Sequence, residues 1–131
     1  MAIEFFIPMI LPTTTHQQKK VSVVKGKPVY YEPAELKDAR RKFTAMLAGK
    51  APSEPINSAV RLLTKWCFPL TGNHSDGEWK TSKPDTDNLI KLLKDVMTDL
   101  HFWKDDAQVA SEITEKFWAA HPGLYVYIES L

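Results

Sequence analysis

Residues that build disulfides, thiolate metal clusters and phosphate-binding loops are scarce in this sequence. Cys67 is the single cysteine, so an internal disulfide and a cysteine-based zinc cluster are both excluded. Only five glycines occur, and no Walker-type loop or G-x-S-x-G nucleophile motif is present. The four histidines are scattered without an H-E-x-x-H pair. Any chemistry of this chain must therefore come from other side chains.

Long apolar runs are also missing. No stretch approaches the ~18 apolar residues that a membrane helix needs, and the first residues lack the basic-then-apolar layout of a signal peptide. Hydrophobic residues make up 44% of the 131 residues and charged residues 25%, which is ordinary globular composition. We expect one domain over residues 1–131, without membrane association and located in the cytoplasm.

A net charge of +1 conceals an imbalance between the two halves of the chain. Residues 1–65 contain 11 Lys and Arg against 5 Asp and Glu, whereas residues 66–131 contain 6 against 11. The balances are therefore +6 and −5. This asymmetry favours a basic surface for a polyanion together with an acidic site, although uneven charge also arises by chance.

Hydrophobic periodicity predicts strands interspersed with two main helices. Proline at the first helical position suits a helix start, and Pro33 precedes an apolar stripe that includes Phe43 and Met46. The expected strands cover residues 3–9, 60–68, 109–117 and 124–128, with a hairpin over 21–31 that turns at residues 25–28, and the helices cover 33–49 and 89–100. No βαβ unit repeats, so we predict a single-domain α+β fold with a mixed sheet.

Carboxylates are dense near the second helix. Six of the sixteen acidic residues lie between Asp85 and Asp106. Asp85 and Asp87 stand two apart in extended chain that leads into the helix, so they can point to the same side. One aspartate suffices to cap a helix, and the pair together with Asn88 exceeds that need, although capping alone remains an alternative. Asp105 and Asp106 form a second pair, for which an exposed turn is the simpler alternative.

Brought together, Asp85, Asp87 and Asp106 would form an all-oxygen site suited to Mg²⁺ or Mn²⁺. Such a metal activates water and neutralises charge on a phosphodiester. Lys91 follows Asp87 by one helical turn, where it is either a solvated lysine or a stabiliser of the phosphate in the transition state.

Two blocks in this region carry a family resemblance. The blocks are Lys83-Pro-Asp-Thr-Asp-Asn-Leu-Ile-Lys91, followed by Asp95, and then Phe102-Trp-Lys-Asp-Asp-Ala-Gln-Val109. They resemble the signature of the RusA family of Holliday junction resolvases, which prophages often encode. The close match covers residues 83–109. The sequence departs from the family in the loop Leu11–Lys20 and at His101, where a glycine is common.

The resemblance implies a homodimeric, Mg²⁺-dependent endonuclease that cuts four-way DNA junctions by paired symmetric nicks in recombination and repair. Mn²⁺ could substitute for Mg²⁺. By position, Asp85, Asp87 and Asp106 would be metal-binding catalytic carboxylates and Lys91 the catalytic lysine. The resemblance gives supporting roles to Asp105, Asp95 and Asn88. Dimerisation also suits the approximate two-fold symmetry of a junction.

Basic residues in the N-terminal half, with one beside the acid pair, are candidates for phosphate contacts. They are Lys19, Lys20, Lys25, Lys27, Lys37, Arg40, Arg41 and Lys83. The alternatives to a resolvase are a nuclease of the same fold that targets other branched or flap DNA, and a branched-DNA-binding protein that has lost catalysis. A structural protein with an incidental acidic turn would need several coincidences of spacing.

Overall fold

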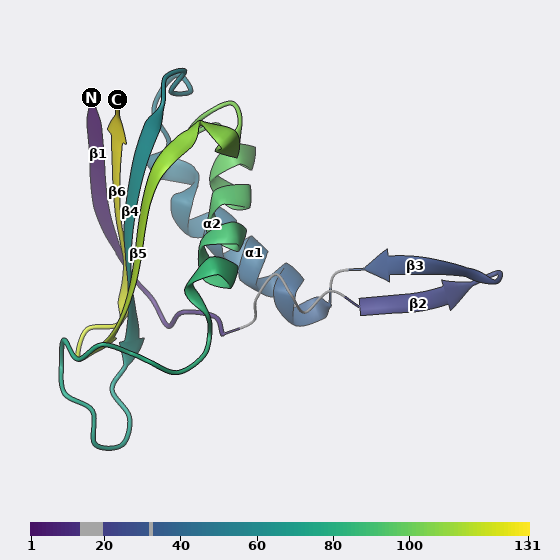
Figure 1. Ribbon diagram of the computed structural model, residues 1–131, viewed down its shortest axis with the longest axis horizontal. Coiled ribbons are helices and arrows are strands. Elements are labelled where there is room, and N and C mark those ends of the chain that lie inside the picture. The colour runs from purple at the N-terminus through teal and green to yellow at the C-terminus, as the bar shows by residue number, and fades with distance from the viewer. Residues whose placement is uncertain (14–19, 32) are drawn as a thin grey trace.

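The computed structural model describes residues 1–13, 20–31 and 33–131. It forms two layers, a four-stranded sheet and two helices that cover one face of it, and a separate hairpin projects from this body (Figure 1). In chain order the elements are β1 (Ala2–Pro8), β2 (Lys20–Val24), β3 (Lys27–Tyr31), α1 (Ala34–Leu47), the 3₁₀ helix η2 (Ala48–Lys50), β4 (Val60–Pro69), α2 (Thr86–Asp99), the 3₁₀ helix η3 (Asp106–Gln108), β5 (Val109–Ala119) and β6 (Gly123–Ser130). The predicted α+β fold with a mixed sheet and two main helices is confirmed.

The order of strands in the sheet decides where the ends of α2 lie. The order is β1-β6-β4-β5, with β6 antiparallel to both β1 and β4, and β4 parallel to β5. Parallel neighbours need a crossover connection, which α2 supplies between β4 and β5. A crossover helix returns along the sheet, so α2 begins near the carboxyl ends of these strands and finishes near their amino ends (Figure 1).

The core lies between the sheet and the two helices. Val60, Leu62 and Trp66 of β4 are fully buried on the helix side, as the alternation predicts. Met46 was expected on the apolar stripe of α1 but is 41% exposed. It lies about 100° around the helix from Leu47, outside the narrow buried stripe. Among the described residues, no helix is long and apolar enough to cross a membrane.

The hairpin β2–β3 stands apart from the core. Its turn is formed by Lys25 and Gly26, which have φ angles of 51° and 77°. Positive φ at both central positions is typical of the turn that matches the twist of a two-residue hairpin. The predicted hairpin is confirmed, with a tighter turn than expected, because Lys27 and Pro28 belong to β3.

Candidate active site

Asp85 and Asp87 lie at the amino end of α2 with exposed side chains. Asp85 holds the position before the first helical residue, with extended backbone (φ −75°, ψ 147°), but its side chain makes no capping hydrogen bond. Asp87 is in the first turn, where a negative charge is favoured by the helix dipole. Capping therefore does not account for the Asp85 carboxylate, which remains available to a ligand.

Asn88 and Lys91 differ in exposure although both follow the acid pair closely. Asn88 is polar, but it is 7% exposed and lies among the inward-facing residues of α2. Lys91 is exposed one turn beyond Asp87, and within the described chain no ion pair engages it. An ammonium in this position can approach an anionic ligand at the amino end of α2.

Two lysines that the sequence analysis missed lie beside the same end of the helix. Lys116 of β5 donates hydrogen bonds to the carbonyls of Ser82 and Pro84, at 2.7 and 2.8 Å. Lys80 is 9% exposed, and burial lowers the pKa of its ammonium, as does the nearby charge of Lys116. Nothing in the local sequence distinguishes these lysines from solvated ones, because their partners are backbone carbonyls, aromatic faces and the Ser82 hydroxyl.

At the other end of α2, Asp105 and Gln108 form a capping box around η3. The Asp105 side chain accepts a hydrogen bond from the Ala107 amide at 2.9 Å. The Gln108 side chain accepts from the Lys104 and Asp105 amides at 2.9 and 3.0 Å. It also donates to the carbonyls of Ile56 and Ser58 at 2.8 and 2.9 Å. Asp105 and Gln108 thus have a structural role in this turn.

Asp106 begins η3 and is half-buried, yet no hydrogen bond or ion pair within the described residues engages its carboxylate. The turn that carries it is pinned to the core, because Phe102 and Trp103 are fully buried and the Trp103 indole donates to Thr98 Oγ1 at 2.8 Å. His101 precedes this pair with φ 63°, in the left-handed region that glycine adopts most easily. The glycine common in the resembled family therefore has a conformational reason.

The three carboxylates proposed as metal ligands do not meet in one chain. Asp85 and Asp87 lie at one end of α2 and Asp106 follows its other end, and a 14-residue helix is about 20 Å long. Across residues 1–13, 20–31 and 33–131, no three His, Cys, Asp or Glu side chains are close enough to hold a metal ion. The single chain therefore presents the expected ligands as two separated groups.

Asp95 lies midway along α2, where it pairs with α1. Its carboxylate is 4.0 Å from the Arg40 guanidinium, and both side chains are about one-third exposed (27% and 32% for Arg40 and Asp95). This contact gives Asp95 a structural role and engages Arg40, which the sequence analysis assigned to DNA.

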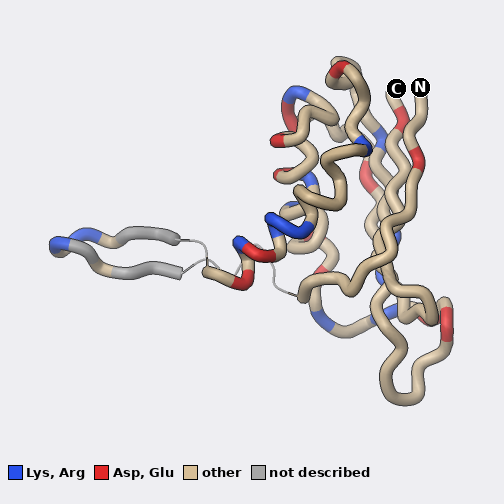
Figure 2. The backbone as a smooth tube through the Cα atoms, turned by 180° about the vertical axis from the view of Figure 1, so that it is seen from behind, with Lys and Arg blue, Asp and Glu red and all other residues tan. Residues whose placement is uncertain are grey.

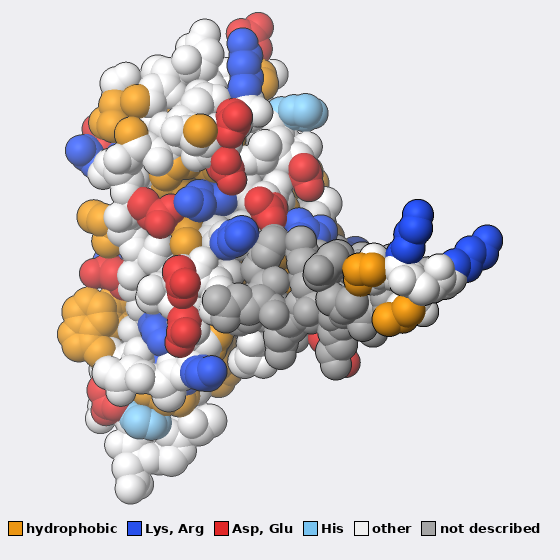
Figure 3. Space-filling view, turned by 45° about the vertical axis from the view of Figure 1, so that its right-hand side comes forward, with side chains coloured by type: hydrophobic (Ala, Val, Ile, Leu, Met, Phe, Trp, Pro, Cys, Tyr) orange, Lys and Arg blue, Asp and Glu red, His pale blue; other side chains and the backbone are white. Residues whose placement is uncertain are grey.

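The other predicted DNA-binding residues are distributed over the hairpin β2–β3, helix α1 and the loop just before the acid pair. Lys25 and Lys27 are exposed at the tip of the hairpin, as the tube view illustrates (Figure 2). Lys37 and Lys83 are exposed, while Arg41 pairs with Asp38 at 3.1 Å. Lys19 lies outside the described residues, and only the backbone of Lys20 is described. Figure 3 shows acidic and basic side chains interspersed over the face it presents.

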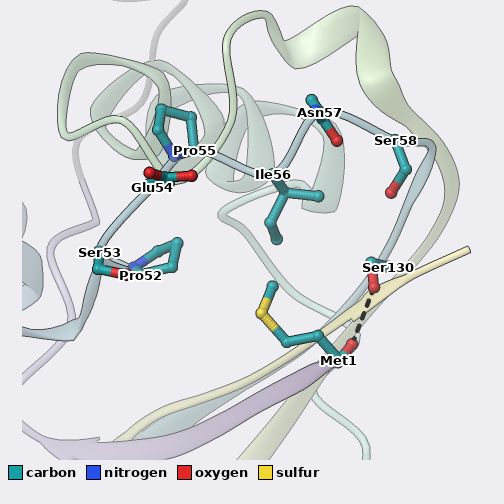
Figure 4. Close-up of a pocket in the computed structure, with 9 residues that line it drawn as sticks. All are labelled: Met1, Pro52, Ser53, Glu54, Pro55, Ile56, Asn57, Ser58 and Ser130. Atoms are coloured by element: carbon teal, nitrogen blue, oxygen red, sulfur yellow. Dashed lines mark hydrogen bonds between the residues drawn. The ribbon is translucent and has the colours of Figure 1, made fainter.

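A pocket of about 340 Å³ opens near the amino end of β4 (Figure 4). It adjoins the loop that anchors Gln108, but the predicted acids are absent from its lining. The lining residues are Met1, Pro52, Ser53, Glu54, Pro55, Ile56, Asn57, Ser58 and Ser130. With a single carboxylate, this pocket does not supply the all-oxygen site that the sequence predicts.

Comparisons with known proteins agree with the motif. A family model described as endodeoxyribonuclease RusA matches residues 10–129. A protein of Lactococcus phage r1t, named crossover junction endodeoxyribonuclease rusA, is 34% identical over 111 residues, which cover 83% of each chain. The uncharacterized protein YqaN of Bacillus subtilis (strain 168) is 27% identical over 121 residues, or 84% of each chain. The similarity thus extends well beyond the two motif blocks.

Proposed function

Because the chain belongs to the RusA family of endodeoxyribonucleases, we propose that it resolves four-way DNA junctions as a Mg²⁺-dependent homodimer. The observation that carries the proposal is a contrast among acids. The fold uses Asp95 and Asp105 in contacts of its own, whereas Asp85, Asp87 and Asp106 accept no hydrogen bond from the described residues. Paired cuts would serve recombination and repair, and the phage relative supports a prophage-type role.

The donor set of Asp85, Asp87 and Asp106 fits Mg²⁺, with Mn²⁺ as a substitute. All three are hard oxygen donors, and their exposed or half-buried positions leave room for the waters that Mg²⁺ retains. When bound, the metal supplies an activated water and neutralises charge on the phosphate. Lys91 places an ammonium one turn from Asp87, where it would hold the phosphate and stabilise the departing oxygen.

A second copy of the chain would complete the site. A two-fold axis across α2 would bring Asp106 of the partner subunit towards Asp85 and Asp87, and the reverse pairing would follow by symmetry. Two equivalent sites would result, one for each strand that a resolvase cuts. The separation of the two halves within one chain supports this arrangement.

The first test is cleavage of a labelled four-way junction, with linear duplex as the control. We expect paired symmetric nicks that require Mg²⁺ and stop in EDTA. Tight junction binding without cuts in either Mg²⁺ or Mn²⁺ would favour the inactive branched-DNA-binding protein, and equal cutting of flaps would favour a nuclease with other targets.

Mixing two inactive variants tests the shared site. In a dimer of one Asp85→Asn and one Asp106→Asn chain, both changes fall in the same site and the other site is intact. Free exchange of protomers should restore about a quarter of the wild-type sites, and these should make single nicks instead of paired ones. The matched control mixes Asp85→Asn with Asp87→Asn, which leaves no intact site. A wild-type protein that cuts while both mixtures stay inactive would show that each site belongs to one chain.

The hairpin supports a role in DNA affinity. Residues 20–31 contain three lysines and no acid, and the tip with Lys25 and Lys27 projects from the body (Figure 2). Each phosphate neutralised contributes about 0.9 to the slope of log affinity against log salt. Junction binding is measured with the Asp106→Asn variant, which should bind without cutting. Adding Lys25→Ala and Lys27→Ala to this variant should reduce the slope by about 2. An unchanged slope would mean that the tip of the hairpin β2–β3 makes no contact with DNA phosphates.

A further inference from the structure

The chain that enters α2 is tied to β5 through two lysine side chains. Lys116 Nζ donates to the Ser82 carbonyl at 2.7 Å and to the Pro84 carbonyl at 2.8 Å. Lys80 Nζ donates to Ser82 Oγ at 2.7 Å, and the Lys80 amide donates to the Lys116 carbonyl at 3.0 Å. Residues 80–84 are therefore held to the sheet edge by charged side chains and by backbone pairing.

Aromatic rings enclose the inner member of this pair. Lys80 Nζ lies 4.1 Å from the centre of the Trp118 ring and 5.3 Å from that of Phe68. Ring faces attract cations, so these contacts offset part of the cost of burying the ammonium. The charge of Lys116 acts against the Lys80 ammonium and lowers the pKa of Lys80 further. Lys80 therefore keeps its place beside Lys116 through the ring contacts and its hydrogen bond to Ser82.

The carbonyl of Pro84 belongs to the peptide group that joins Pro84 to Asp85. The orientation of this peptide plane determines φ of Asp85, and so the direction in which its side chain leaves the backbone. Lys116 fixes that plane by binding its carbonyl oxygen. With φ held at −75° and ψ at 147°, Asp85 makes no capping hydrogen bond through its side chain.

We infer that Lys116, supported by Lys80, is a positioning residue that prearranges Asp85 and Asp87 for a divalent cation. The inference rests on the proposed function, because it assigns these two carboxylates to a metal. Residues that orient metal ligands typically change metal affinity or activity by 10- to 100-fold when they are replaced. Lys116 itself would touch neither metal nor DNA.

The variants for the test are Lys116→Met, Lys116→Arg and the control Lys94→Met. Lys94 pairs with Glu112 at 2.8 Å, so its replacement also removes a lysine contact between the α2 region and β5, at a site away from the acid pair. Three properties are measured: Mn²⁺ affinity by calorimetry, hydrogen exchange of amides 82–88 without metal, and the Mg²⁺ dependence of junction cleavage.

We expect Lys116→Met to weaken Mn²⁺ binding and to raise the half-maximal Mg²⁺ concentration by about tenfold, with most of the maximal rate regained at saturating Mg²⁺. Exchange of amides 82–88 should quicken. Lys116→Arg should recover most of the affinity, and Lys94→Met should stay within about twofold of wild type. If Lys116→Met does not fold, Lys116→Gln takes its place.

Unchanged Mn²⁺ affinity and Mg²⁺ requirement in a folded Lys116→Met protein would overturn the inference, as would equal losses in Lys94→Met. Failure of the proposed function has a different signature. A wild-type protein that binds Mn²⁺ but never cuts junctions would refute that function, and the Mn²⁺ and exchange measurements would still decide the role of Lys116.

Discussion

At the amino end of α2, two aspartates face solvent and accept no hydrogen bond from the described part of the chain, whereas at its carboxyl end one of two adjacent aspartates serves as a cap. Asp105 accepts the Ala107 amide, while its neighbour Asp106 accepts no hydrogen bond from the described residues. Within an acid-rich segment, the protein contacts therefore separate carboxylates that maintain the fold from those that remain available to a ligand.

The largest expected effect comes from the adjacent pair. Asp106→Asn should lower the rate of junction cleavage by more than about 100-fold, because loss of a metal ligand exceeds the loss of a group that only orients one. Asp105→Asn keeps a side chain that caps well, so its rate should fall by less than about tenfold. Single-turnover cleavage at saturating protein measures both. Similar losses of cleavage rate in the two variants would mean that Asp105 and Asp106 do not differ in role.

Gln108 is expected to give the largest stability effect at the carboxyl end. Gln108→Ala removes four hydrogen bonds, including those to the Ile56 and Ser58 carbonyls, and should lower the free energy of unfolding by about 2–3 kcal/mol. Urea denaturation followed by tryptophan fluorescence reports this change. Asn57→Ala, an exposed change in the same loop, is the control. Equal stability of the two variants would mean that the side-chain hydrogen bonds of Gln108 do not stabilise the fold.

A smaller stability difference should separate Asp105 from Asp106. Asp105→Ala removes the cap of η3 and should cost about 1 kcal/mol of unfolding free energy. Asp106→Ala should cost less than about 0.5 kcal/mol, since no residue outside the gaps at 14–19 and 32 donates a hydrogen bond to its carboxylate. Denaturation without metal keeps ligand binding out of the measurement. A greater loss of unfolding free energy in Asp106→Ala than in Asp105→Ala would mean that the Asp106 side chain stabilises the fold.

The smallest effect is expected in the middle of α2. Arg40→Met removes the guanidinium that pairs with Asp95 and should lower the free energy of unfolding by less than about 1 kcal/mol, as is usual for partly exposed ion pairs. Thermal melting at low and high salt should show the difference shrinking as salt rises. A loss that is large and insensitive to salt would mean that Arg40 acts by packing and not by charge.

Local patterns in the sequence predicted most of the fold. The alternation in β4, the apolar stripe of α2 and the hairpin over residues 21–31 each depend on neighbouring residues, and the structure confirms all three, with the hairpin turn shortened from residues 25–28 to Lys25 and Gly26. The spacing of the acids also indicated the segment that carries the proposed site. Their roles could not be separated in this way, because Asp105 and Asp106 are adjacent and chemically identical.

The chain by itself determined its periodicities, its turn residues and the supply of oxygen ligands, since each of these follows from residue type and short-range spacing. Tertiary structure decided the burial of Asn88, the contacts of Lys116 and the distance between the two halves of the proposed site. The physical reason is the parallel pairing of β4 with β5. It requires α2 to cross back along the sheet, and so it carries acids that are near in sequence to opposite ends of a helix about 20 Å long.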